Sequence, residues 1–137
     1  MKRSQAVKRL DSWFSKYIRL RDADSSGYVR CITCGTRKYW KEVDAGHFQT
    51  RAKYSTRWDE RNVNAQCKGC NMVNGGQQYV HGLAIDKKFG EGTADELVIL
   101  SNQIVKLSTR EILDLAEEYK NKFKELEQEK GGLGMNT

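Results

Sequence analysis

Apolar residues recur every three or four positions over residues 2–21, a period that predicts an amphipathic helix. The apolar positions are Ala6, Leu10, Trp13, Phe14, Tyr17 and Ile18. Most lysines and arginines of the segment lie off this stripe, so we expect a helix with a basic outer face. It should end in the loop-like composition of residues 22–27.

Shorter runs replace the helical period in the middle of the chain. We predict, in order, strands at residues 28–30 and 39–43, irregular structure at 45–61, and a short helix at 63–73 that ends at Asn74-Gly75-Gly76. The segment from Cys31 to Cys34 lies between the two strands and predicts a tight turn.

Helical patterns return after this point. We expect a helix over 77–89, a second one from a capping box at Thr93–Glu96, a long one from a capping box at Ser108–Glu111, and a frayed tail from Gly131. The long helix carries a stripe of Ile112, Leu115, Tyr119, Phe123 and Leu126. Such a stripe must be buried. Two partners are open: the chain's own N-terminal helix, or the same helix of a second copy in a homodimer.

The composition indicates a class of binding partner, and it does so through its charge. The chain has 137 residues, which suits one domain, and a formal net charge of +6. The basic residues are concentrated before residue 62, which favours a polyanion such as nucleic acid. We see no secretory signal and no apolar run long enough to span a membrane, so we expect a cytoplasmic protein.

Four cysteines form two pairs, Cys31-x-x-Cys34 and Cys67-x-x-Cys70. Disulfides are typical of secreted chains, and a redox pair is not expected twice. Two such pairs suit one tetrahedral zinc ion with four thiolate ligands. A site with four cysteine ligands is closed, so this zinc should be structural and should hold the ends of the intervening segment together.

The segment between the pairs resembles a known motif. Asp44-Ala45-Gly46-His47-Phe48, then Asp59-Glu60-Arg61-Asn62-Val63, then Gln66-Cys67-Lys68 and Cys70-Asn71, are similar to the HNH nuclease motif and, more narrowly, to the phage NinG and Rap recombination proteins. The resemblance covers about residues 20–90. It implies a ββα-metal fold and an endonuclease of branched recombination DNA.

Phosphodiester hydrolysis needs a base for the attacking water and a cation at the phosphate. His47 can take the proton, because histidine titrates near neutral pH. The HNH arrangement implies that Asn62 accepts the other imidazole N–H and orients the ring. Asn71 would offer an oxygen ligand to a catalytic Mg²⁺ or Mn²⁺ ion.

One position departs from the common HNH pattern. Many such enzymes have a metal-binding Asp or His directly before the base, and here that position is Gly46. Asp44 would lie on the same strand face as Gly46, so it is a second candidate ligand across the space that the glycine leaves. Alternatively, Asp44 is structural and Asn71 is the sole protein ligand.

The remaining candidate site residues are basic side chains that could bind DNA. Arg51, Lys53, Arg57, Arg61 and Lys68 flank the motif and are candidate contacts to the DNA backbone. Tyr54 and Trp58 lie among them and either stack on an exposed base or pack under the loop. His81, the second histidine, has no ligand-type neighbours in its helical segment, and we expect a surface or core residue.

The sequence therefore predicts an α+β fold: a small zinc-stapled ββα-metal (HNH) nuclease core at residues 28–76, between a basic helix (1–22) and a helical C-terminal part (77–130). The predicted function is a metal-dependent DNA endonuclease acting on Holliday junctions, D-loops or flaps in a bacterial host. Two alternatives are a non-catalytic zinc-finger DNA-binding accessory protein and an RNA-binding zinc ribbon.

Overall fold

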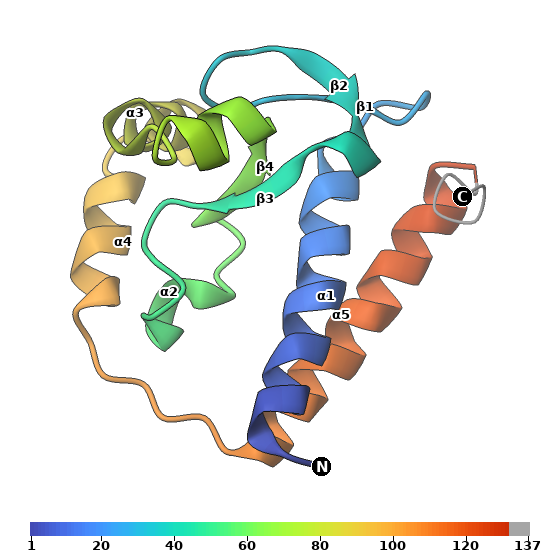
Figure 1. The fold of residues 1–137 in the computed structure, drawn as a ribbon, viewed down its shortest axis with the longest axis vertical. Helices are drawn as coiled ribbons and strands as arrows, with labels where there is room; N and C mark the ends of the chain where they lie inside the picture. Colours follow the sequence, from blue (N-terminus) through green and yellow to red (C-terminus); the bar gives the residue numbers. More distant parts are fainter. Residues whose placement is uncertain (132–137) are drawn as a thin grey trace.

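The computed structural model describes residues 1–131; residues 132–137, most of the predicted tail, lie outside the described part. The elements in chain order are α1 (Arg3–Arg21), β1 (Tyr28–Arg30), β2 (Arg37–Tyr39), the 3-10 turn η1 (Trp40–Glu42), β3 (Asp44–His47), α2 (Tyr54–Arg57), β4 (Val63–Gln66), the π-helical turn η2 (Gly69–Val73), α3 (Gln78–Phe89), α4 (Thr93–Ser101) and α5 (Thr109–Glu129). Figure 1 shows helices around two small sheets, which confirms the α+β class.

The first and last helices, α1 and α5, pack side by side along most of their length (Figure 1). The rings of Phe14 and Tyr119 meet edge to face with centroids 4.8 Å apart, and Ile112 and Phe123 are also buried. The apolar stripe of α5 is thus covered within the chain. Because α1 already covers this stripe, the stripe does not require a second copy of the chain, and the homodimer stays a prediction. No helix within residues 1–131 has the length and apolar character needed to cross a membrane.

One carboxylate from the loop before β4 contacts both helices of this pair. Glu60 accepts hydrogen bonds from the hydroxyls of Tyr17 on α1 and Tyr119 on α5, at 3.1 and 3.0 Å, and from Lys122 Nζ at 3.3 Å. Burial, and then the Glu60 charge, raise the pKa of Tyr17 to about 12. Both tyrosines therefore stay protonated donors at neutral pH.

Each sheet is one antiparallel pair of strands, β1 with β2 and β3 with β4. In the second pair Asp44 faces Gln66 and His47 faces Val63. The predictions of irregular structure at 45–61 and of a helix from residue 63 were therefore wrong at β3, α2 and β4. Every residue of β4 is buried, including two polar ones, so the alternation that identifies a half-exposed strand is absent.

The two predicted capping boxes had different outcomes. Ser108 and Glu111 form the expected reciprocal box at the start of α5, with Glu111 N donating to Ser108 Oγ at 3.0 Å. The box at Thr93 is not formed. Instead, Asp86 of α3 accepts from Ala94 N at 2.8 Å, so a carboxylate from the preceding helix caps α4.

Candidate active site and metal centre

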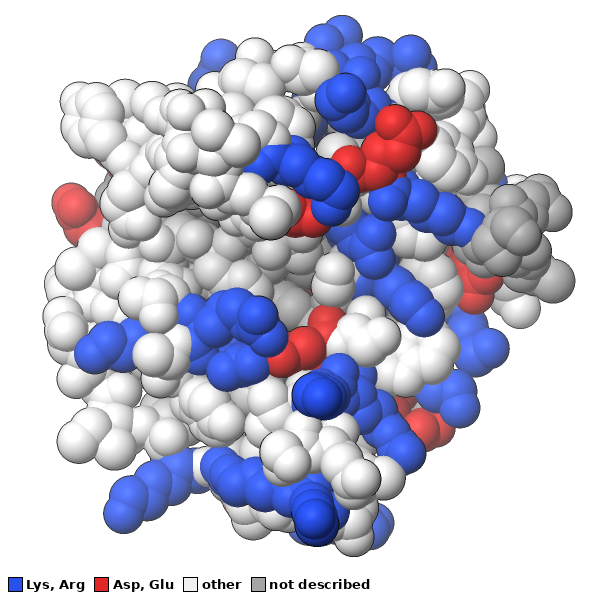
Figure 2. Space-filling view, in the orientation of Figure 1, with Lys and Arg blue, Asp and Glu red and all other residues white. Residues whose placement is uncertain are grey.

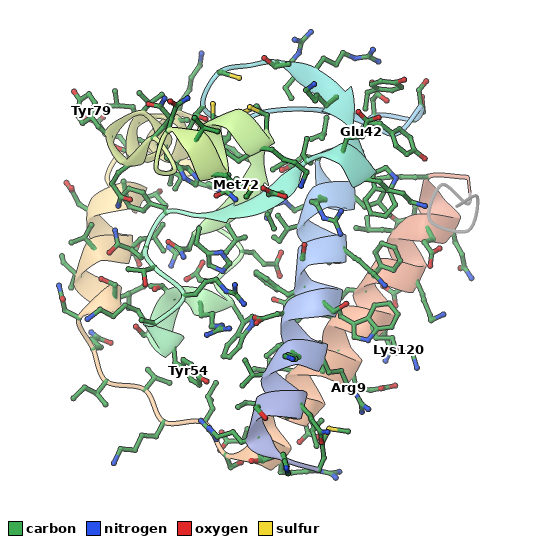
Figure 3. All side chains as sticks on the ribbon, viewed as in Figure 1. Arg9, Glu42, Tyr54, Met72, Tyr79 and Lys120 are labelled. Atoms are coloured by element: carbon green, nitrogen blue, oxygen red, sulfur yellow. The ribbon has the colours of Figure 1, made fainter. Side chains whose placement is uncertain are left out.

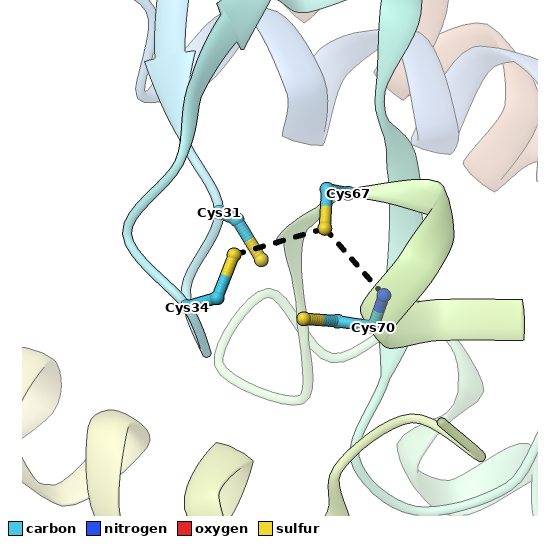
Figure 4. Close-up of side chains that lie close together, drawn as sticks. All are labelled: Cys31, Cys34, Cys67 and Cys70. Carbon is cyan, nitrogen blue, oxygen red and sulfur yellow. Dashed lines mark hydrogen bonds between the residues drawn. The ribbon is translucent and has the colours of Figure 1, made fainter. Parts of the chain in front are cut away.

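The four cysteines meet at one point, as predicted (Figure 4). Their sulfur atoms all lie within 4.8 Å of one another, and the Cys34 and Cys67 sulfurs are 3.8 Å apart. Zinc–sulfur bonds of about 2.3 Å in a tetrahedron place the sulfurs about 3.8 Å apart. The cluster is therefore positioned to hold a metal ion of this size.

This cluster joins two hairpins. Cys31 and Cys34 lie in the turn between β1 and β2, whereas Cys67 follows β4 and Cys70 lies in η2. Burial raises the pKa of the Cys31 thiol, but hydrogen bonds from the Thr33 hydroxyl and from backbone N–H groups outweigh it and hold the pKa at about 6. The arrangement favours a metal-binding thiolate.

A cavity of about 590 Å³ opens between α1, β3 and η2. Basic side chains surround this hollow in Figure 2. Its lining includes five of the residues predicted from the sequence: Asp44, His47, Arg51, Lys68 and Asn71. Residues that are far apart along the chain thus share one polar opening beside the cysteine cluster.

The imidazole of His47 is oriented by a backbone carbonyl. Its Nε2 lies 3.0 Å from Arg57 O. A carbonyl only accepts hydrogen bonds, so Nε2 carries the proton and Nδ1 keeps its lone pair. Burial, with the charges of Arg51 and Arg57, lowers the pKa of His47 below its ordinary value of 6.5. The ring is neutral at pH 7 and can accept a proton at Nδ1.

The predicted hydrogen bond between Asn62 and the His47 imidazole is not formed. Asn62 Oδ1 accepts from Gln49 N at 2.8 Å, and its Nδ2 donates to Gln49 O at 3.1 Å and to Thr56 O at 3.0 Å. The fully buried amide therefore holds the loop between β3 and β4 in place. Since Arg57 belongs to that loop, Asn62 positions His47 indirectly.

Asp44 and Asn71 do lie together. Asn71 Nδ2 donates to Asp44 Oδ2 at 3.0 Å, and Lys68 Nζ lies 2.6 Å from Asp44 Oδ1. Burial raises the pKa of Asp44, but these bonds and the charges of Lys68 and Arg19 outweigh it and lower the pKa. An ionised carboxylate and the Asn71 amide thus meet at the edge of the cavity. Their oxygens are ligands that suit a hard divalent cation, which would replace the present bonds of Asp44 to Lys68 and Asn71.

Comparisons with known proteins agree with the resemblance to the NinG proteins. The family model described as "Bacteriophage Lambda NinG protein" matches residues 1–129. The chain belongs to the NinG family. It is 31% identical to the protein ninG of Salmonella phage P22 over 125 residues, and 30% identical to those of Escherichia phages lambda and 933W.

These alignments cover 90% of this NinG-family chain but only 58–59% of each relative, so the chain spans about three fifths of their length. The family match also extends beyond residues 20–90, to which the motif resemblance was limited, and includes all of α1 and α5. The helical pair is thus part of the family's shared sequence. No solved structure was found to match the chain.

The space beside Gly46 in this NinG-family chain is filled by protein. A Cβ added there would meet Gln66 Oε1 at 2.0 Å. The Gln66 side chain continues past the glycine, and its Nε2 donates to Gly76 O at 2.8 Å. The space across which Asp44 was predicted to reach an ion is therefore occupied by Gln66, and metal binding by Asp44 stays a prediction. Gly46 admits the glutamine that holds the turn after η2.

Four of the five predicted DNA contacts are paired with acidic residues, and the side chains of two of these four, Arg51 and Lys68, stay 61% exposed although they pair with Asp11 and Asp44. Arg57 binds Asp11 of α1 through Nη2 at 2.6 Å and has a side chain only 13% exposed. Arg61 pairs with Asp59 and Glu96. Lys53 lines a separate small cavity near residues 101–105. Arg57 and Arg61 therefore brace the loop, and only Arg51 and Lys68 of the five line the main cavity.

Tyr54 and Trp58 pack under this loop and are not free to stack on a base. Trp58 is buried in the cluster that contains Phe14, and its Nε1 donates to Asp11 at 2.9 Å. Tyr54 meets Trp58 at a ring distance of 5.0 Å. Of the two predicted roles, stacking on a base or packing under the loop, the structure shows packing.

The sequence pattern did not identify Arg19 and Lys41 as cavity residues. Arg19 Nε donates to Ser15 within α1, and the guanidinium lies over the Trp40 ring at 5.4 Å. Within residues 1–131 its two terminal nitrogens have no hydrogen-bond partner, which leaves them available to an anion in the cavity. The basic face predicted for residues 2–21 was the one sequence signal for Arg19. Helix periodicity alone, however, does not show which part of the fold that face lies against.

His81 is a core residue, one of the two options expected. It is fully buried against the Phe48 ring, and within the described residues neither ring nitrogen has a hydrogen-bond partner. Burial, with the nearby His47, lowers the pKa of His81 to about 4. The ring therefore acts as a neutral packing group beneath the residue that follows His47.

Proposed function

We propose that this chain is a metal-dependent DNA endonuclease of the HNH (ββα-metal) type that acts on branched recombination intermediates in a bacterial host. The observation that carries the proposal is the cavity itself. A neutral histidine with a free Nδ1, two oxygen-bearing side chains and several basic groups open into one space. The order β3, β4 and η2 supplies the two strands and the helical turn of such a site.

His47 is the general base in this proposal. Its Nε2–H is held by Arg57 O, so Nδ1 faces the reaction and takes the proton of the attacking water. Asp44 and Asn71 would hold Mg²⁺ or Mn²⁺, which supplies positive charge for the phosphate oxygens and the leaving 3′ oxygen when bound. Arg51, Lys68 and Arg19 would hold the DNA phosphates at the rim.

A structural zinc ion is the second part of the proposal. The four sulfurs have the spacing that zinc requires, and a site of four cysteines has no open position for a substrate. Cys70 immediately precedes Asn71, so the metal would fix the turn that carries a catalytic ligand. Zinc bound here would position the site without taking part in the reaction.

The test is DNA cleavage by the purified chain with its zinc content measured. We expect nicking of supercoiled plasmid with added Mg²⁺ or Mn²⁺ and none without it. Labelled flaps, D-loops and four-way junctions should be cut in preference to plain duplex. A chain that binds these DNAs tightly but cuts none of them with any divalent ion would instead be a zinc-finger accessory protein, and preference for single-stranded RNA would point to an RNA-binding zinc ribbon.

A further inference from the structure

Large apolar side chains are exposed on η2 and α3, next to the cavity. Met72 is 70% exposed, Val73 82%, Tyr79 77%, Val80 39% and Leu83 54%. We call these five residues the η2–α3 apolar surface. Tyr79, Val80 and Leu83 share one side of α3 because residues three and four apart in a helix are neighbours. Several exposed apolar groups on two consecutive segments are more than singly scattered ones, and such an accumulation marks an interaction surface.

This surface adjoins the candidate active site. Asn71, Gly75 and Gly76 line the cavity, and Met72 and Val73 lie between them in the chain. In Figure 3 Met72 lies on the side of η2 toward β3, while Tyr79 lies on the outer side of α3. A DNA strand with one phosphate in the cavity would therefore meet η2 and α3 with its next nucleotides.

The backbone holds the turn of this surface in an unusual shape. η2 is a π-helical turn, a rare form that is frequent at functional sites. Gly75, Gly76 and Gln77 follow with φ of 63°, 83° and 50°, and left-handed backbone is costly for a glutamine. Gln66 fixes the turn by donating to Gly76 O. The exposed side chains are thus presented by a fixed segment.

Charge distinguishes the two sides of the cavity. The lining includes Arg19, Lys41 and Arg51, with Lys68 at the start of η2, whereas the surface farther over η2 and α3 in the upper left of Figure 2 has few charged atoms. DNA has the matching division, with anionic phosphates and uncharged base faces. In duplex DNA the base faces are stacked on one another, and only unpaired bases can offer them to aromatic and apolar side chains.

We propose that the η2–α3 apolar surface binds unpaired DNA bases, with Tyr79 as the stacking residue, while the neighbouring phosphate lies in the basic cavity. The placement of that phosphate rests on the proposed endonuclease function. Selection of branched DNA would then come from single-stranded nucleotides beside the branch point, which a continuous duplex does not supply.

The test compares the double variant Val73→Ser/Tyr79→Ser with a control, Ile99→Ser/Ile104→Ser, whose two apolar residues are 65% and 89% exposed on other segments. Affinity is measured without added Mg²⁺ or Mn²⁺ for a duplex with a single-stranded tail and for the same duplex with blunt ends. The tail carries 2-aminopurine, whose fluorescence reports stacking.

Wild type and control should quench the 2-aminopurine and bind the tailed DNA equally. The double variant should lose the quenching and bind the tailed DNA about 10-fold more weakly, with blunt-duplex affinity unchanged. Equal losses on both DNAs, or no loss, would overturn the proposal, as would light scattering that shows these residues holding two copies together with no effect on DNA. If the tail-specific loss appears but wild type cuts nothing with Mg²⁺ or Mn²⁺, the surface stands and the endonuclease proposal fails.

Discussion

The α1–α5 pair and the region formed by β3, β4 and η2 are stabilised by different interactions. The helical pair is apolar and aromatic: Phe123 lies 5.9 Å from both the Trp13 and the Trp40 rings, measured between centroids. The second region buries the amides of Asn62, Asn64 and Gln66 and ends at the four cysteines. The first depends on burial of apolar area. The second shares Val63 and Ala65 with that apolar core, but it also depends on hydrogen bonds and on the cysteine cluster.

This difference predicts which region should respond to which kind of substitution. Apolar packing is lost gradually as methylene groups are removed, at a cost set by transfer and cavity terms. A polar region loses its geometry when a single partner is removed, since the other partner is left buried and unpaired. The two regions should therefore be separable by substitution.

The largest effect should come from removing one cysteine. Cys67→Ser should abolish bound zinc and cleavage together, because structural zinc contributes about 10 kcal/mol or more to such sites. Hydrogen exchange should show lost protection in β3, β4 and η2 but retained protection in α1 and α5. Ser25→Ala, an exposed change in the turn after α1, is the control, and a Cys67→Ser protein with full zinc content would contradict the prediction.

The next largest effect should come from the helical pair. Phe123→Ala should lower the free energy of unfolding by about 3–5 kcal/mol, because it removes a buried aromatic side chain. The cleavage rate per folded molecule should stay unchanged. Denaturant titration measures the first quantity, with exposed Lys124→Ala on the same helix as control. A lost rate with little change in stability would show that the two regions are not separable.

A smaller effect should appear in the acid stability of the chain. His81 has a pKa of about 4 when folded and an ordinary value of 6.5, so the unfolded chain binds more protons between these values. This contribution is complete above pH 6.5 and is lost as the pH falls toward 4. The free energy of unfolding should fall between pH 7 and pH 5 by about 2 kcal/mol less in His81→Phe than in wild type. Parallel stability curves would mean that His81 does not titrate as described.

An effect on stability of similar size, together with a modest effect on rate, should follow Asn62→Ala. The loop loses three hydrogen bonds, which costs about 1–3 kcal/mol. His47 would then lose the fixed position of Arg57 O, so cleavage should slow by about 10-fold with DNA affinity unchanged. Exposed Asn102→Ala is the control. Full activity in the Asn62 variant would show that the loop position does not matter to His47.

The sequence predicted these regions unequally, for a physical reason. The periodic apolar residues identified α1 and α5 almost to their ends, and the paired cysteines and the motif around His47 identified residues that the structure brings together. β4 was assigned as helix because two of its four buried positions are polar and no alternation of burial marks a strand. Their partners, such as Gly76 O for Gln66, are set by tertiary structure and leave no local pattern.

The basic residues show the same limit. Arg57 and Arg61 lie beside the motif and were predicted to contact DNA, but each is paired with acidic residues from other segments. Arg19 lies far from the motif in sequence, yet it lines the cavity because α1 crosses next to β3. Proximity along the chain is a poor guide to which charges remain available.

The active-site assignment is tested most directly by the single-turnover cleavage rate of His47→Ala on a flap or four-way junction with Mg²⁺ or Mn²⁺, measured together with its DNA affinity. We expect a rate at least about 100-fold below wild type, because the general base is lost. Affinity should be nearly unchanged, since the imidazole acts on water. Cleavage by His47→Ala at the wild-type rate would contradict the assignment of this cavity as the active site.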